Sequence, residues 1–553
     1  MIDRSDERQM SRESTDRSPG STRSWEIAAL SASVLILILQ LVGLSPHLSL
    51  MDDGARYYLV GLGIWSGMGP RAFWLVDMPW SLVQPLGWPT LVGAVAWPLK
   101  HFWSLGAGVV VARVLNAALW SVAGYMSYRL LRRFVWPGLA FSAAMLTWLS
   151  SPGIESATDL MAEPLFLVLV LLTLDRVIAL TRRGVVSTSD AITVVALAIA
   201  SFFVRTVGIA LLLAILPFLW RHWRWGLGLV AAAVFAWVGL EWLNTSGLVP
   251  VVRVVSYSDA IAQGDPFARG SEIFSVLGAF LRVLGNLYSY AAWGIPSTLF
   301  PLWGFPGYRI LLALFYVLLV YGAVVLFLRE RFTLVPLATY SVIYMLVISV
   351  ALPFSRYLIP MLPILALLVA AACQGFLMTK RSARVRVITV AALLVAAVAT
   401  QLPRAVGEVS EGVIARSEGS GWPYRPEFKP FFEVARWFAG NSPTDAAVLV
   451  RDGAVFYVSS GRQAIDWAQG NGESGDVVCE RLKRIAGERP VFVVELVDDD
   501  PEWGLVTAIE SVRGHCSANL QSMDVYIGGA VIYRFMIDAH PSANGPTAEA
   551  QGA

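Results

Sequence analysis

The sequence has 553 residues, of which 56% are hydrophobic and 15% are charged, and its formal net charge is +2. This composition excludes an intrinsically disordered chain and is typical of a protein that crosses a membrane many times. The small net charge provides no basic field for nucleic acid, so we expect no nucleic-acid partner. The 3 Cys residues are too few for a thiolate metal cluster, and none lies in a C-x-x-C arrangement.

The polar N-terminal stretch 1–24 is rich in Ser, Arg and acids, which predicts a disordered tail. The apolar run that follows has no small-residue cleavage site, so we expect it to remain as a membrane anchor. Eleven apolar runs in all are candidates for helices that cross the bilayer. They cover 26–44, 106–131, 136–151, 161–180, 189–204, 206–220, 225–243, 308–328, 332–352, 357–378 and 386–402.

The positions of Lys and Arg predict how these helices are oriented. If the N-terminal tail is cytoplasmic, every inside turn is basic: 129–134, 181–184, 221–224, 329–331 and 380–386. Cytoplasmic loops carry this excess of positive charge. We therefore expect an integral protein of the cell (plasma or inner) membrane, with the transmembrane domain at 25–402 and everything after residue 402 outside.

The first outer segment, 45–105, is too apolar for an ordinary loop. Counting 87–103 as a membrane span would invert every later loop and place the basic turns outside. Its Trp and Phe residues beside Lys100 instead favour a helix lying in the membrane interface. The stretch 55–67 has the same character more weakly.

Residues 403–538 have the composition of a small extracytoplasmic α/β domain, with amphipathic helices alternating with apolar strands. Cys479 and Cys516 both lie in it, which permits a disulfide outside the membrane; two reduced buried thiols are the alternative. The last stretch, 539–553, is expected to be a disordered tail. The predicted fold is thus an all-α polytopic membrane protein with an appended α/β domain.

Acidic residues form two candidate functional clusters on the outer side. Asp52 and Asp53 directly follow the first apolar run and precede the apolar segment 55–105. Ionisable groups held near a membrane are costly and tend to be functional, although a solvated helix end is the ordinary reading of a loop acid. Glu155, Asp159 and Glu163 recur at four-residue spacing, which would put them on one face of a helix. A frayed loop before the span is the alternative.

Two Arg residues fall on the same side, Arg205 in "FFVRTVG" and Arg356 in "PFSRYLIP". A guanidinium binds phosphate through parallel hydrogen bonds, while snorkelling to lipid headgroups is the simpler role of such an Arg. The sequence contains no G-x-x-x-x-G-K-[ST] loop and no G-x-G-x-x-G after a strand. The outer face therefore suits an anionic lipid together with a polar partner.

Five short motifs occur in the order found in one superfamily. They are "DDGARYYLVGLGIWSGMGPR", "QPLGWPTLVGAVAWPL", "ARVLNAALWSVAGYMSYRLLRRF", "DLMAEPLFLVLVLL" and "SRYLIPMLPILALL". The chain resembles the C-type (GT-C) polytopic glycosyltransferases, which include protein O-mannosyltransferases and the lipid A aminoarabinose transferase. The resemblance covers about residues 26 to 402. It departs from the pattern in the spacing between the acidic pair and Tyr57, and in having Gln84 where relatives often have Lys or Pro.

The resemblance implies a transferase that moves a sugar from a polyprenyl-phosphate donor in the lipid bilayer to a hydroxyl of a lipid, glycan or protein acceptor. It implies inversion, with Asp53, or else Asp52, as the general base. Arg205, Arg356 and Tyr357 would bind the donor phosphate. Asp159, Glu163 and Tyr57 would serve the acceptor or a cation.

Metal dependence is left open by the sequence, since members of this superfamily differ. Asp52, Asp53 and Glu163 could ligate Mg²⁺ or Mn²⁺ through oxygen. The alternative function is a transporter or flippase of a lipid-linked sugar, but no repeat of halves supports it. A non-enzymatic assembly factor is a third reading, for which eleven spans would be an unusually large anchor.

Overall fold

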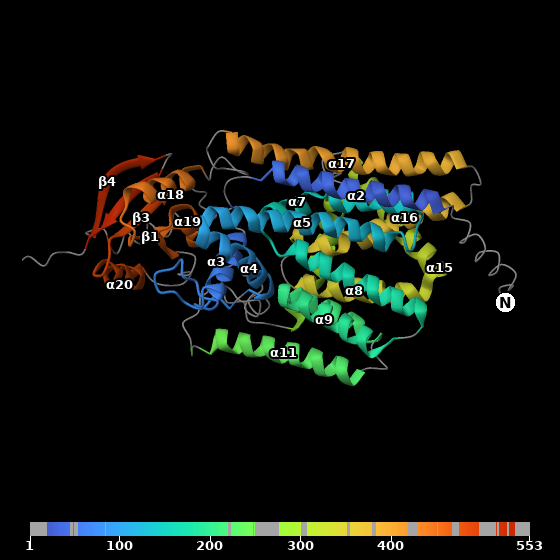
Figure 1. The fold of residues 1–553 in the computed structure, drawn as a ribbon, viewed down its shortest axis with the longest axis horizontal. Coiled ribbons are helices and arrows are strands. Elements are labelled where there is room, and N and C mark those ends of the chain that lie inside the picture. The colour runs from blue at the N-terminus through green and yellow to red at the C-terminus, as the bar shows by residue number, and fades with distance from the viewer. Residues whose placement is uncertain are drawn as a thin grey trace, which may run out of the picture.

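The computed structural model describes residues 19–44, 48, 53–82, 84–184, 186–218, 223–246, 248, 276–299, 307–350, 354–378, 383–417, 429–450, 452–466, 475–496, 516, 519–527 and 530–536. Asp52 and both expected tails, 539–553 and all but the last residues of 1–24, lie outside these ranges. Within them, long helices run side by side and a small sheet lies at one end of the bundle (Figure 1). The chain is thus a mostly helical membrane protein with a small mixed sheet.

Each expected apolar run falls on a helix. The helices are α2 (Pro19–Val42), α5 (Leu105–Leu131), α6 (Pro137–Trp148), α8 (Glu163–Arg183), α9 (Thr188–Val204), α10 (Ile209–Ile215), α11 (Trp223–Thr245), α15 (Tyr308–Val350), α16 (Leu362–Met378) and α17 (Ala383–Ser417). Among the described residues, 5 helical stretches are long and apolar enough to cross a membrane, namely Arg23–Val42, Leu105–Leu131, Glu163–Arg183, Tyr308–Val350 and Ser355–Leu377. The count of eleven spans therefore remains a prediction.

Two expected runs, 308–328 and 332–352, correspond to the two helices that meet within α15. The 43 residues of α15 contain a kink at Glu330, whose φ of −135° and ψ of 31° are not helical, so a helix lies on each side of it. The break falls in the predicted basic turn 329–331. There Arg182 Nη2 donates to Glu330 Oε2 at 3.1 Å, so the end of α8 is joined to the bend of α15.

Helix α17 extends past the domain boundary expected at residue 402. It continues to Ser417 and lies beside α2 (Figure 1). A Cβ on Gly412 would come within 1.8 Å of the Gly43 carbonyl oxygen, so the two backbones are in direct contact there. The outer loop 244–306 also contains helices that the sequence did not indicate: α13 (Val276–Ser289), a π-helical turn η3 (Tyr290–Gly294) and α14 (Ile295–Leu299).

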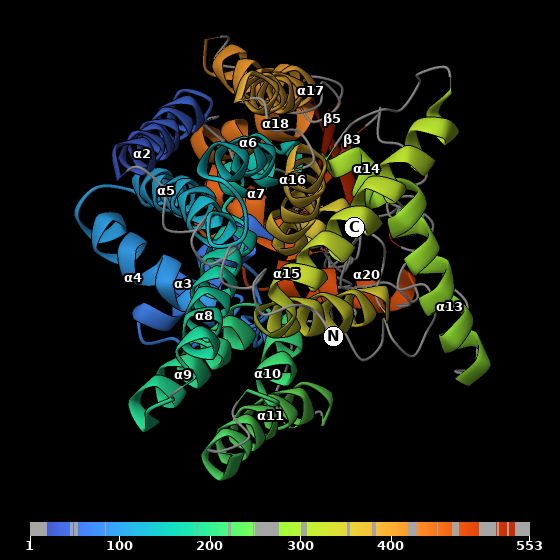
Figure 2. The same cartoon turned by 90° about the vertical axis from the view of Figure 1, so that its right-hand side faces the viewer.

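The view along the bundle separates an inner group of helices from an outer one. α6, α8 and α16 lie near the centre, while α2, α11, α13 and α17 lie at the periphery (Figure 2). The peripheral helices expose large apolar side chains, such as Leu35 on α2 and Phe235 on α11. Such side chains suit contact with lipid.

The outer segment forms the two helices expected of it, α3 (Gly54–Trp65) and α4 (Gly87–Phe102). They cross closely, since a Cβ on Gly93 would be 2.2 Å from the Gly61 carbonyl oxygen. Trp88 near the start of α4 is fully buried, whereas Phe102 and Trp103 at its end are about three-quarters exposed. Exposed aromatic rings at one end of the helix fit a location at the membrane interface.

The C-terminal domain contains a five-stranded mixed sheet of order β2-β1-β3-β5-β4. Its strands are β1 (Ala447–Val450), β2 (Gln463–Asp466), β3 (Val491–Leu496), β4 (Leu520–Ile527) and β5 (Ala530–Phe535), and its helices are α18 (Lys429–Asn441), α19 (Gly453–Ser460) and α20 (Gly475–Ala486). β1 pairs in parallel with β2 and β3, and β5 pairs antiparallel with β3 and β4. Cys479 and Cys516 form the disulfide that their location permits.

The sheet is joined to the first outer segment through its β2 edge. Ala464 N donates to Trp74 O at 2.8 Å, and Val76 N donates to Ala464 O at 3.2 Å. Arg481 Nη2 lies 2.9 Å from Asp77 Oδ2, which adds an ion pair from α20. The segment between α3 and α4 therefore extends the sheet and holds it against these two helices (Figure 1).

The sheet and the basic turns lie at opposite ends of the bundle. Helix α8 begins at Glu163 on the sheet side and ends at Arg183 in a basic turn. Its 21 residues span about 30 Å, the thickness of a hydrocarbon core. We call the end that holds α3, α4 and the start of α8 the site end, and the end that holds the turns 129–134, 181–184 and 329–331 the basic end.

Candidate functional site

Asp53 immediately precedes α3 and is half-buried. Its Oδ1 accepts a hydrogen bond of 2.8 Å from Nε2 of Gln84, which lies just before α4. A deprotonated carboxylate only accepts hydrogen bonds, so the amide must present its nitrogen to it. The starts of the two outer helices are thus joined through the candidate base.

Gly54 brings Asp53 against the turn that links α7 (Ser151–Thr158) to α8. A Cβ at this position would lie 2.0 Å from the backbone oxygen of Asp159, a distance that no side chain tolerates. Trp88 Nε1 donates to Leu160 O at 3.0 Å from the α4 side. Leu160 itself has a φ of +62°, which a Leu rarely adopts. Both outer helices are therefore packed on one tight turn.

The expectation that Glu155, Asp159 and Glu163 share a helical face is wrong. Helix α7 ends at Thr158 and α8 begins at Glu163, so the three acids lie on two helices and the turn between them. Pro164 in the first turn of α8 explains the break, because Pro has no amide hydrogen for the carbonyl four residues earlier and its ring clashes with that carbonyl, so the helix cannot run through this turn. Glu155 is exposed, whereas Asp159 and Glu163 are each 1% exposed.

Glu163 forms an ion pair with Arg205, which follows the last residue of α9. The Arg205 and Glu163 side chains are 11% and 1% exposed, so this charge pair is almost completely removed from solvent. The guanidinium carbon of Arg205 lies 5.1 Å from the ring centre of Tyr357. The sequence singled out all three residues, and the structure brings them together.

Arg356 joins the same cluster from the short helix η4 (Ser355–Met361). Its guanidinium carbon lies 5.7 Å from the centre of the Tyr357 ring. Glu163 and Asp53 are near enough for their negative charges to stabilise its positive charge, and Arg205 opposes this. Two cations and the candidate base thus share one electrostatic environment.

Two tyrosines around Tyr357 carried no signal in the sequence. Tyr344 Oη, from α15, donates to the backbone oxygen of Tyr357 at 2.7 Å and fixes the position of η4. Tyr290, in the π-helical turn of the outer loop, is fully buried. Burial raises the pKa of its phenol, and neighbouring Tyr357 acts in the same direction while Arg205 acts against it. Its hydroxyl is therefore protonated and able to donate at neutral pH.

Tyr57, the third residue expected to serve the acceptor or a cation, lies on α3. It is in the first turn of α3, is 6% exposed and packs in the hydrophobic core. Within the described part of the chain, no group of three or more His, Cys, Asp or Glu residues could hold a metal ion, and Asp52, one of the three candidate ligands, lies outside that part. Glu163 Oε1 and Asp53 Oδ1 are instead engaged by Arg205 and Gln84.

No family model and no curated protein sequence matches the chain, but solved structures do. ArnT from Cupriavidus metallidurans, determined with bound undecaprenyl phosphate, aligns with a TM-score of 0.54 at 13% identity, covering 92% of this chain and 98% of that one. The oligosaccharyltransferase of Archaeoglobus fulgidus, determined in complex with Zn and sulfate, aligns with a TM-score of 0.50 at 13% identity. This alignment covers 84% of this chain and 67% of that one.

The chain has the fold of the GT-C membrane glycosyltransferases. The alignment with ArnT includes nearly all of both chains, so the GT-C likeness extends over the helical bundle and the appended sheet domain together. At this level of identity the likeness concerns the fold.

Proposed function

We propose that this GT-C protein transfers a sugar from a polyprenyl-phosphate donor to an acceptor hydroxyl at the outer surface of the membrane. The observation that carries the proposal is the cluster of the partly buried Arg205, Arg356 and Tyr357 around the buried Glu163, near Asp53 at one end of the bundle. Ionisable groups buried at a membrane boundary are costly, so they are expected to act on a ligand. The bound undecaprenyl phosphate of ArnT supports this donor class.

The proposed reaction uses Asp53 as the general base. The acceptor oxygen attacks the anomeric carbon while its proton passes to the Asp53 carboxylate. The bond between the anomeric carbon and the phosphate oxygen breaks, and its electron pair leaves with the polyprenyl phosphate. Attack opposite the leaving group inverts the configuration, as in inverting glycosidases.

The two Arg residues are proposed to bind the donor phosphate. A guanidinium presents five N–H donors in a planar fork that matches phosphate, and Glu163 holds that of Arg205 in place. Positive charge fixed before the reaction stabilises the phosphate as it gains charge. Tyr357, whose ring lies against both guanidinium groups, is the proposed third contact.

The orientation is proposed to follow the positive-inside rule. The basic end would be cytoplasmic, together with the N-terminus, and the site end and sheet domain would be extracytoplasmic. About eleven spans are consistent with this arrangement, because an odd number places the two termini on opposite sides. The acceptor is proposed to be a lipid, glycan or protein of the cell envelope.

The test is to incubate the purified protein with a panel of radiolabelled polyprenyl-phosphate sugars and measure which one is consumed. A general base contributes roughly 10²- to 10⁴-fold, so Asp53→Asn should abolish detectable transfer at normal expression. Asp52→Asn is the matched variant next to it. Full activity in both variants would contradict the assignment of the base, and movement of the donor across vesicles without its consumption would favour a flippase.

A further inference from the structure

We propose that Gln84 is a positioning residue that holds the Asp53 carboxylate in the orientation needed to receive the acceptor proton. The inference rests on the proposed function, since it assigns a second residue to the same base. The hydrogen bond from Gln84 Nε2 to Asp53 Oδ1, at 2.8 Å, is its starting point. With Oδ1 engaged by the amide, Oδ2 is the oxygen assigned to the acceptor proton.

The two bonded residues sit on a rigid support. Each lies just before one of the outer helices, and those helices are in backbone contact where Gly61 meets Gly93. The start of α3 rests on Asp159 through Gly54, and α4 is fixed to Leu160 through Trp88. Because both partners are anchored to the same turn, the bond between them is part of a preformed arrangement.

A neutral amide such as that of Gln84 is a suitable hydrogen-bond donor to a carboxylate that acts as a general base. An ammonium group beside a carboxylate would strongly favour its charged form and weaken it as a proton acceptor. A neutral amide orients the same oxygen with a smaller effect on basicity. The Gln84 Oε1 atom is buried and has no hydrogen-bond partner among the described residues. The hydrogen bond from Nε2 to Asp53 Oδ1 is therefore the contact that orients this amide.

The charged groups around Asp53 would remain in place when Gln84 is changed. They are Arg356 on η4, Asp159 in the α7–α8 turn, Arg56 at the start of α3, Glu163 at the start of α8 and Arg205 at the end of α9. Replacing one neutral side chain by another alters none of these charges. A change in the pH dependence of a Gln84 variant can therefore be assigned to the lost hydrogen bond.

The experiment measures donor consumption against pH for Gln84→Met, which keeps the length of the side chain and removes the donor. We expect kcat to fall about tenfold, KM for the polyprenyl-phosphate sugar to stay within about threefold, and the acidic limb of the pH–rate profile to move up by about one pH unit, because a lost hydrogen bond disfavours the carboxylate. Gln84→Lys restores a donor and should move the limb the opposite way, below that of wild type.

Gln374→Met is the matched structural control. Gln374 is a buried amide that accepts from Trp136 N at 2.8 Å, next to the basic end, so its loss should lower thermal stability without moving the pH profile. A folded Gln84→Met protein with the wild-type kcat and profile would overturn the proposal. So would a rise in KM alone, which would make Gln84 a donor-binding residue. If Asp53→Asn were active, the base assignment would fail instead, whatever Gln84 does.

Discussion

The two ends of helix α8 hold their charges in opposite ways. At the site end, Glu163 and Arg205 pair with side-chain exposures of 1% and 11%. At the basic end, the side chains of the Arg133–Asp175 pair are 27% and 23% exposed, and those of the Arg182–Glu330 pair are 34% exposed each. The same kind of ion pair is therefore buried at one end and solvated at the other.

The difference supports the proposal that the pair at the site end serves a ligand. Removing two charges from water is expensive and is seldom repaid by their mutual attraction, so a buried pair is weak evidence for stability and better evidence for another role. Solvated pairs contribute little and are common at a cytoplasmic membrane surface. This contrast supports the proposed location of the chemistry at the site end and the proposed cytoplasmic location of the basic end.

Replacing Glu163, a buried acid of the site end, should have the largest effect on stability and activity. Glu163→Ala leaves the Arg205 charge buried without its partner, which typically costs about 3–5 kcal/mol. We expect a clear fall in the thermal unfolding midpoint in detergent and a loss of donor consumption. Glu163→Gln keeps the shape and should lose donor consumption with a smaller loss of stability. Wild-type stability in the Ala variant would show that the pair is not buried as described.

The variant Gly54→Ala should have the next largest effect on stability and activity. The new Cβ would lie 2.0 Å from the Asp159 backbone oxygen, and relieving such a contact typically costs about 1–3 kcal/mol. The shift would also displace Asp53, so the rate of donor consumption should fall more than tenfold. Gly239→Ala, in α11 with nothing within 4 Å of the new Cβ, is the control and should be neutral or stabilising. Equal effects of the two variants would refute the close packing of the site.

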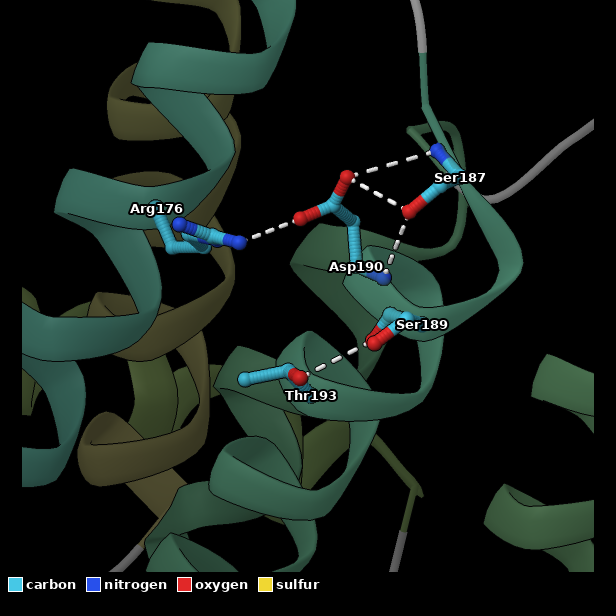
Figure 3. Close-up of polar contacts among 5 residues, drawn as sticks. All are labelled: Arg176, Ser187, Ser189, Asp190 and Thr193. Carbon is cyan, nitrogen blue, oxygen red and sulfur yellow. Dashed lines mark hydrogen bonds and ion pairs between the residues drawn. The ribbon is translucent and has the colours of Figure 1, made fainter.

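The smallest effect is expected at the basic end. Arg176 pairs with Asp190 at the start of α9, where the Asp190 carboxylate also accepts from Ser187 Oγ at 2.7 Å (Figure 3). Ser187 Oγ in turn accepts from Asp190 N, which forms a capping box that does not need the Arg. Arg176→Ala should leave donor consumption and the unfolding midpoint unchanged within error. A loss of activity would mean that the basic end contributes to the reaction.

Much of the fold could be predicted from hydropathy, because every expected apolar run falls on a helix. The differences from the expected boundaries have local causes. The kink at Glu330 separates two helices in α15, as the basic turn 329–331 predicts, and α17 continues past 402, where Gly412 contacts Gly43 at the end of α2. Helix α13 was not expected, since its amphipathic sequence in a long loop gives no clear span.

The candidate site was predicted in its parts but not in its contacts. Arg205, Arg356, Glu163 and Asp53 were chosen because charges at outer helix ends are unusual, and three-dimensional packing then decided which of them pair. The face shared by Glu155, Asp159 and Glu163 was mistaken because Pro164 separates two helices. In the sequence, Tyr290 and Tyr344 look like ordinary aromatic core residues. A role for Gln84 is indicated by its hydrogen bond to Asp53, which the sequence does not show.

The most direct test of the account is to measure sugar transfer in sealed vesicles that expose only one face of the protein. The polyprenyl-phosphate sugar identified in the panel is supplied together with an impermeant acceptor, first on the face that carries the sheet domain and then on the opposite face. We predict consumption of the donor with inversion only when the sheet-domain face is supplied, and none in Asp53→Asn. Transfer that requires the opposite face, or that proceeds at the wild-type rate in Asp53→Asn, would contradict the account.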